Sequence, residues 1–111
     1  MVDTPFDERW KYAPELSIAA STFTGATVAL GTLIHVPVLM VMQNDTTVSV
    51  FLSDDGTSTN GKTFIVGERI VLDIRTNKGN ANAAAFPIGT IFSVTGSVGT
   101  GTFKISYIYV Q

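Results

Sequence analysis

Few side chains in this sequence of 111 residues could carry out chemistry, and the single histidine is the first of them. His35 stands between the apolar residues Ile34 and Val36, and Pro37 follows. A catalytic histidine needs a nucleophile or an orienting acid close to it. The sequence contains neither a Gly-X-Ser-X-Gly motif nor a His-Glu-X-X-His motif, which would supply such a setting. We therefore interpret His35 as a loop or interface residue held by packing.

One group of acidic and amide residues could supply oxygen ligands to a metal ion. It comprises Asp45, Asp54, Asp55, Asn44 and Asn60. Calcium takes roughly six to eight oxygen ligands, and the residues after Asp54 lack the spacing of an EF-hand loop. Asp and Asn at strand ends usually cap turns through their own backbone. We favour turn capping, with a calcium site as the alternative, and we expect no metal and no cofactor.

Carboxylate pairs and glycine-rich loops are the remaining catalytic possibilities. Glu68 and Asp73 both lie near strands, but Glu68 falls in a turn and Asp73 on a polar face, so a glycosidase pair is not indicated. No helical pattern follows the glycines, as a phosphate-binding loop requires. Cysteine is absent, which excludes cysteine nucleophiles, thiolate zinc sites and disulfides. We expect that the protein is not an enzyme and has no catalytic residue.

The composition limits the remaining classes of function. Hydrophobic residues make up 45% of the chain and charged residues only 14%, with a formal net charge of −2. Such a chain has the length of one domain and enough apolar residues for a core. It has no basic field for a phosphate backbone, so we expect no nucleic-acid partner. Because the charged residues are few, we also expect that much of the surface is covered in an assembly.

A continuous apolar stretch at residues 26–42 raises the question of a membrane span. It falls short of the roughly 18–20 apolar residues that cross a bilayer. Gly31, His35 and Pro37 interrupt it. The stretch is better explained by two buried strands joined by a turn, and we expect no membrane association.

From Leu16 onward the sequence is typical of β-structure. Val, Ile, Thr, Phe and Tyr fill short runs, and Gly, Asn, Asp and Ser cluster between the runs. No window carries a convincing helical period. We predict strands at residues 17–22, 26–30, 38–43, 47–53, 62–66, 70–75, 90–95 and 102–110. Residues 38–42 are apolar without alternation, which predicts a central strand covered on both faces.

The strand count and spacing predict an all-β fold. About eight short strands with regular turns indicate an antiparallel β-sandwich, jelly-roll-like in outline, over residues 16–111. Residues 1–15 differ, because they combine many charges with Phe6, Trp10 and Tyr12. They are either a disordered leader or an extended N-terminal arm that docks on a neighbour. We favour the arm, since exposed aromatic side chains gain free energy when a partner covers them.

Aromatic residues recur at a spacing of two in the last predicted strand. Phe103, Tyr107 and Tyr109 share one face there, together with Ile105. Such a stripe could stack on sugars or bases, but it is more typical of a core or a subunit interface. The candidate partner or oligomer contacts are therefore Phe6, Trp10, Tyr12, Tyr107 and Tyr109.

Several segments together resemble a known class of proteins. An apolar strand ends in Gln43-Asn44, a short strand ends in a polar turn, and the pattern Gly61-X-X-apolar-X-X-Gly67-Glu68 leads into another apolar strand. Residues 87–92 then lead to glycine-rich turns and a final alternating strand. From about residue 36 to residue 110, the chain is similar to the small β-sandwich virion proteins of tailed bacteriophages, which include head decoration (cement) proteins, head-fibre bases and neck or tail components.

The resemblance implies a structural role without catalytic residues. We expect a capsid decoration protein that stabilises the head by binding between subunits of the major capsid protein or to another virion protein. It also implies a homo-oligomer, with a trimer favoured, and location in the virion after assembly in the host cytoplasm. The alternative is a carbohydrate-binding β-sandwich module for receptor or glycan adhesion, which requires exposed aromatic residues.

Overall fold

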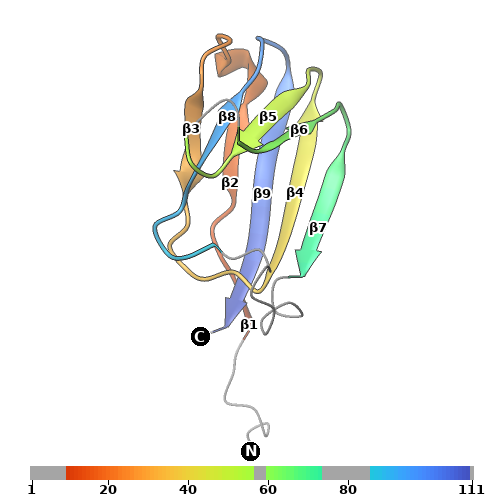
Figure 1. Cartoon of the computed structure of the whole chain (residues 1–111). Coiled ribbons are helices and arrows are strands. Elements are labelled where there is room, and N and C mark those ends of the chain that lie inside the picture. The colour runs from red at the N-terminus through yellow and green to blue at the C-terminus, as the bar shows by residue number, and fades with distance from the viewer. Residues whose placement is uncertain (1–9, 57–59, 74–85, 111) are drawn as a thin grey trace, which may run out of the picture.

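The chain folds into two antiparallel β-sheets packed face to face (Figure 1). This computed structural model describes residues 10–56, 60–73 and 86–110. One turn of 3-10 helix, η1 (Ala20–Thr22), follows β2. The strands are β1 (Trp10–Tyr12), β2 (Leu16–Ala19), β3 (Val28–Thr32), β4 (Leu39–Thr46), β5 (Val50–Ser53), β6 (Lys62–Phe64), β7 (Arg69–Asp73), β8 (Ile91–Thr95) and β9 (Gly101–Val110).

The order of the strands is that of a jelly roll. In the first sheet, β1 and β2 both pair with β9, which is followed by β4 and β7; the second sheet has the order β3-β8-β5-β6. Strands β1 and β2 lie one after the other along β9, so they share one strand position and the sandwich has eight positions. The chain changes sheet at every connection except β1–β2 and β5–β6. The prediction of an antiparallel jelly-roll sandwich of about eight strands is confirmed.

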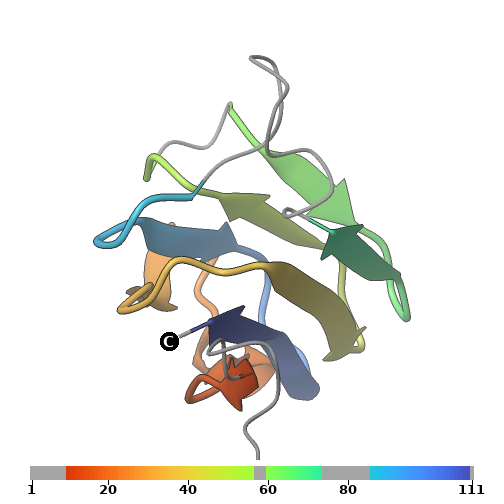
Figure 2. The same ribbon diagram turned by 90° about the horizontal axis from the view of Figure 1, so that it is seen from below.

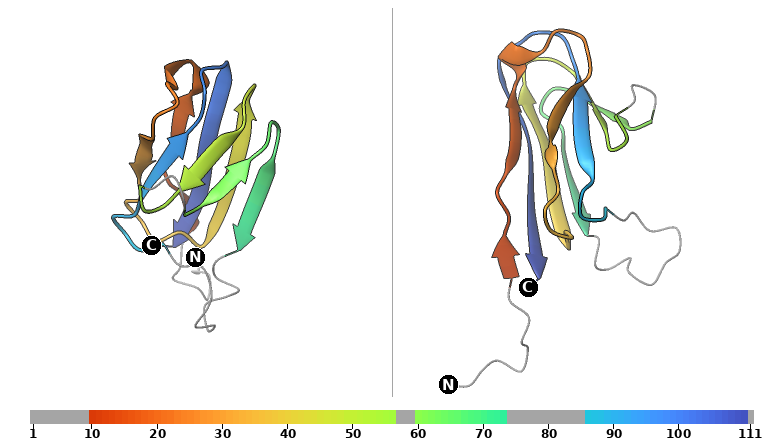
Figure 3. Two further views of the ribbon diagram at one scale, coloured as in Figure 1. Left: turned by 45° about the horizontal axis from the view of Figure 1, so that its top comes forward. Right: turned by 90° about the vertical axis from the view of Figure 1, so that its left-hand side faces the viewer.

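The two layers are seen edge-on in Figure 2 and in the right panel of Figure 3. Alternation explains which side chains fill the space between them. In β4 the even-numbered residues Met40, Met42 and Asn44 are buried, and in β9 Phe103 and Ile105 are buried. Each large apolar side chain placed there contributes about 1.5–3 kcal/mol of transfer free energy, which makes this core the main stabilising feature.

The prediction that residues 38–42 are covered on both faces is wrong. Burial alternates along β4, with Met40 and Met42 buried and Leu39 and Val41 only half-buried. Strand β4 is central in its sheet, between β9 and β7, but only one face of that sheet meets the other layer. Central position within a sheet and burial on both faces are separate properties, and the apolar composition did not distinguish them.

Several strand limits differ from the prediction. The strand predicted at 17–22 ends at Ala19, where η1 begins. The strand predicted at 47–53 begins only at Val50, because residues 47–49 form the turn that crosses between the sheets. The apolar stretch 26–42 is divided into β3 and β4 as expected, and these strands lie in different sheets. Within the described residues, no helix is long and apolar enough to cross a membrane.

The N-terminal segment contributes to the sheet earlier than predicted. Strand β1 lies within residues 1–15 but pairs with the end of β9, with Trp10 opposite Val110 and Tyr12 opposite Ile108. The first sheet therefore includes residues that we assigned to the arm. Residues 1–9, with Phe6, lie outside the described residues, so an arm remains a prediction for those residues alone.

Candidate functional site

Four large apolar side chains are exposed at the end of the sandwich where β1 lies and β9 finishes. Tyr12 is 87% exposed, Ile34 and Val36 are each 54% exposed, and Ile88 is 64% exposed. We call these four residues the base surface. They come from β1, from the loop between β3 and β4, and from the turn before β8, at the lower end of the molecule in Figure 1.

Backbone hydrogen bonds hold these three segments against the sheets. The N–H of Val38 donates to the carbonyl of Ile108 at 3.0 Å, which fixes the loop after Val36 beside the end of β9. Tyr12 is the direct partner of the same Ile108 in the first sheet. The N–H of Gly89 donates to the carbonyl of Leu33 at 2.8 Å, which places the turn that contains Ile88 next to Ile34. The base surface is thus assembled from distant parts of the sequence.

His35 lies within this region and packs as the sequence predicted. Its ring is stacked on that of Tyr109, with centroids 3.6 Å apart and planes 7° from parallel. His35 and Tyr109 are both half-buried. The stack anchors the loop between β3 and β4 onto β9, so that the side chains on either side of His35, Ile34 and Val36, remain outside.

The opposite end of the sandwich, which we call the far end, is organised around a buried polar residue. Asn44 has no exposed surface. Its Nδ2 group donates to the carbonyls of Val48, Phe64 and Ile65 at 2.9, 3.0 and 3.1 Å. Its Oδ1 accepts from both the N–H and the hydroxyl of Thr46. These bonds join the turn after β4 to the strand β6 of the other sheet.

The alternative of Asn44 as a metal ligand is therefore wrong, because its Oδ1 is buried and accepts two hydrogen bonds from Thr46. The other members of the predicted cluster are dispersed as well. Asp45 pairs with Lys104 at 3.4 Å, whereas Asp55 accepts from Ser53 Oγ at 2.6 Å and from Asn60 Nδ2 at 3.1 Å. The Asp55 contacts are those of a capped turn. Among the described residues, no three His, Cys, Asp or Glu side chains are placed to hold a metal ion.

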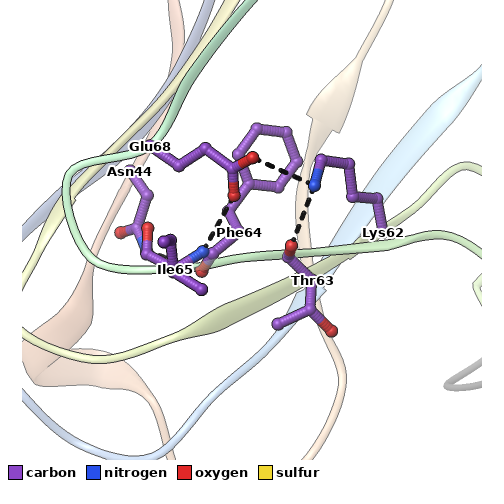
Figure 4. A network of polar contacts seen from close by, with 6 residues as sticks. All are labelled: Asn44, Lys62, Thr63, Phe64, Ile65 and Glu68. Atoms are coloured by element: carbon purple, nitrogen blue, oxygen red, sulfur yellow. Dashed lines mark hydrogen bonds and ion pairs between the residues drawn. The ribbon is translucent and has the colours of Figure 1, made fainter.

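Glu68 and Asp73 do not form a glycosidase pair. They lie just before and at the end of β7, and five residues of extended chain separate them by about 16 Å. Retaining or inverting glycosidases need carboxylates roughly 5–9.5 Å apart. Glu68 instead pairs with Lys62 at 3.1 Å and accepts from the N–H of Ile65 at 3.0 Å (Figure 4). The Lys62 contact, followed by the bond from Ile65, holds the pKa of Glu68 below its ordinary value of 4.5.

The structure separates the predicted aromatic contacts. Tyr107 is 3% exposed and belongs to the core, so it offers no contact area to a partner. Tyr109 packs partly against the core and carries the stack with His35. Trp10 lies in β1, and Phe6 lies outside the described residues. Of the five candidates, Tyr12 is the residue whose exposed side chain the structure places on the base surface.

Sequence reasoning missed Ile34, Val36 and Ile88. All three lie outside the predicted strands and were not singled out as contact residues. The available signal was an adjacent proline in two places, Pro37 directly after Val36 and Pro87 directly before Ile88, since proline marks a turn in which the strand alternation stops.

Comparison of the whole chain with protein-family models, with curated proteins and with solved structures gives no match.

Proposed function

We propose that this protein is a non-enzymatic structural component of a tailed-bacteriophage virion, and that it decorates the capsid by binding between major capsid subunits. The observation that carries the proposal is the base surface: four exposed large apolar side chains gathered at one end of a jelly roll. Grouped apolar side chains of this size at a protein surface mark a contact with another protein. The resemblance to small virion proteins supplies the class of partner.

A capsid lattice suits a surface of this kind. Tyr12, Ile34, Val36 and Ile88 expose large apolar side chains at one end of the sandwich, and each contributes transfer free energy at about 25 cal/mol per Å² when a partner covers it. The area of one copy is modest, but a homotrimer presents three copies to a repeated surface. Linked binding events then raise the overall affinity without new contacts. We accordingly place the protein in the virion, after assembly in the host cytoplasm.

The carbohydrate-binding alternative loses its main support. Sugar binding needs aromatic rings exposed on a flat face, and Tyr107 and Tyr109 were the residues proposed for that role. Tyr107 is buried, and one face of the Tyr109 ring is covered by His35. Tyr12 has a largely exposed aromatic ring, but it lies on the base surface among aliphatic side chains.

Co-sedimentation with empty heads tests the proposed function. The full chain is mixed with heads assembled from the major capsid protein encoded alongside it, and bound protein is measured after centrifugation. We expect saturable binding with a fixed number of copies per head and no signal on a glycan array. No co-sedimentation, or selective glycan binding in its place, would contradict the proposal.

The N-terminal arm gives a second, separable test. Deletion must stop at residue 9, because β1 begins at Trp10 and pairs with β9. We expect the shortened chain to keep its folded stability and to bind heads more weakly, since the arm prediction gives residues 1–9 a share of the contact. The measurements are thermal unfolding and the same co-sedimentation assay. Unchanged binding would remove the arm from the account and leave the base surface in it.

A further inference from the structure

The outward-facing side of the second sheet carries no charged residue on its four described strands. Register shows which residues lie there: Phe51 is opposite both Thr63 and Thr95, Ser53 is opposite Ser93, and Thr32 is opposite Ile91. The alternate residues, such as Leu52 and Val94, are in the core. We call this side the uncharged face. Its exposed or half-buried residues are Ala29, Thr32, Phe51, Thr63, Ile91 and Thr95, whereas Ser53 and Ser93 lie on the same side but are buried and offer no contact area.

The charged residue within these strands confirms the pattern. Lys62 opens β6, but its partner in the register is Leu52, so it lies on the side that faces the other sheet. Its ammonium group reaches Glu68 at 3.1 Å at the open edge between the sheets. The uncharged face is therefore not interrupted by the lysine. Asp54 and Asp55 follow β5 and border the face at one end, where they line a hollow with Ile91 and Ser93.

The outer face of the first sheet is different in kind. Lys104 on β9 and Asp45 on β4 form an ion pair at 3.4 Å across it. Arg69 and Asp73 project from the same side of β7, opposite Gln43 and Leu39 of β4. That face has the mixed charges of a solvent-exposed surface, whereas the second sheet has none at the equivalent positions.

We propose that the uncharged face binds a second copy of this chain and lies at the symmetry axis of a homo-oligomer. A closed ring brings copies of the same residue together around its axis. Identical charges repel each other there, and their burial costs free energy. Hydroxyl groups do not have this difficulty, because each can donate and accept, so a threonine can bond to its own copy. The face can therefore pack against a second copy of itself without bringing like charges together.

The apolar residues on this face supply the hydrophobic part of the contact. Ile91 is 50% exposed, and Phe51 is half-buried. Around them the side chains are small, which lets two sheets approach to the spacing of about 10 Å that packed sheets adopt. Within the chain, the hydroxyls of Thr27 and Thr95 already lie 2.8 Å apart, in a bond whose donor either residue could be.

The biological role of this oligomer rests on the proposed function. The second sheet, whose outer side is the uncharged face, runs along the length of the sandwich, and the segments that carry the base surface lie at one end of it (Figure 3). If the symmetry axis also runs along the strands, every copy presents its base surface in the same direction. A ring of this kind offers several base surfaces to one lattice at once.

The test is the oligomeric state of the full chain, measured by size-exclusion chromatography with light scattering. Two alanines, both exposed and both on strands, give a matched pair: Ala29 on the uncharged face and Ala19 on the outer face of the first sheet. We expect the wild-type chain and Ala19→Glu to form the same oligomer. We expect Ala29→Glu to shift to monomer, with at least a tenfold increase in the dissociation constant.

A second pair guards against a folding defect. Thr63→Glu on β6 and Ser17→Glu on β2 repeat the comparison at other exposed positions, and thermal unfolding shows whether each variant is folded. The inference is overturned if the wild-type chain is a monomer at high micromolar concentration. It is also overturned if folded Ala29→Glu and Thr63→Glu variants keep the wild-type mass. Binding of heads by such a monomer would preserve the proposed function, so the two failures are distinguishable.

Discussion

The two ends of the sandwich are held together by different contacts. At the far end, a buried amide, Asn44, joins β4, the turn after it and β6 through five hydrogen bonds. At the base, Tyr12, Ile34, Val36 and Ile88 leave large apolar side chains in solvent. The far end satisfies its polar groups within the chain, which serves stability. The far end also exposes Ile65, Val66 and Val98, so the base is distinguished by the way its apolar side chains come from three separate segments joined by backbone hydrogen bonds and the His35–Tyr109 stack.

Replacing the buried amide is expected to have the largest effect on stability. Asn44→Ala removes a donor shared by three carbonyls and the acceptor of Thr46, while the surroundings stay closed to water. We expect the free energy of unfolding to fall by about 3 kcal/mol, because buried polar groups lose their partners. Chemical denaturation measures this loss. The neighbouring substitution Gln43→Ala is the control, and equal losses for the two variants would contradict the role of Asn44.

A glycine at the far end is expected to have the next largest effect. Gly101 opens β9 with φ at 87°, and a side chain at this position would clash with the backbone carbonyl oxygen of Asp45. Gly101→Ala therefore combines backbone strain with a clash against another backbone, for a loss of about 2–4 kcal/mol. Gly67 also has a positive φ, of 82°, but open space around it, so Gly67→Ala should cost only about 1 kcal/mol. Thermal unfolding compares the two variants.

The ion pair between Lys62 and Glu68 is expected to make a smaller contribution to stability, and this contribution depends on pH. The pKa of Glu68 is lowered from 4.5 in the folded chain, first by its bond with Lys62. Its contribution is therefore complete above the unfolded pKa and is lost as the pH falls below 4.5 and through the folded pKa. Glu68→Gln should lose stability at neutral pH and approach wild type in acid. Denaturation at pH 7 and at pH 3 tests this, and a constant difference would contradict it.

The contrast between the ends also shows what the sequence could predict. The alternation of side chains in β9 and turn residues such as Asn60 and Gly61 were sufficient to predict the sandwich. Both are local properties of the sequence, because they depend only on residues close together in the chain. The inward position of Tyr107 was open to either interpretation, since alternation defines a face but not what covers it. The base surface depends on hydrogen bonds between residues far apart in sequence, such as Gly89 with Leu33, which no local pattern contains.

Asn44 illustrates the same limit in a polar residue. In the sequence it stands beside Asp45, and the two were equivalent as possible metal ligands. In the structure, strand alternation turns Asn44 into the core and Asp45 to the surface, where Asp45 meets Lys104. A one-residue difference in position therefore decides between a stabilising network and a surface ion pair.

The most direct test of the central claim compares one valine from each end. Val36 on the base surface is 54% exposed, and Val98 at the far end is 66% exposed, so serine replaces a similar apolar side chain in each case. The affinity of the wild-type chain, Val36→Ser and Val98→Ser for empty heads is measured by co-sedimentation. We predict that Val36→Ser binds about tenfold more weakly, which corresponds to roughly 1.4 kcal/mol, while Val98→Ser binds as wild type does. Equal binding by the two variants, or a loss confined to Val98→Ser, would contradict the assignment of the base as the docking surface.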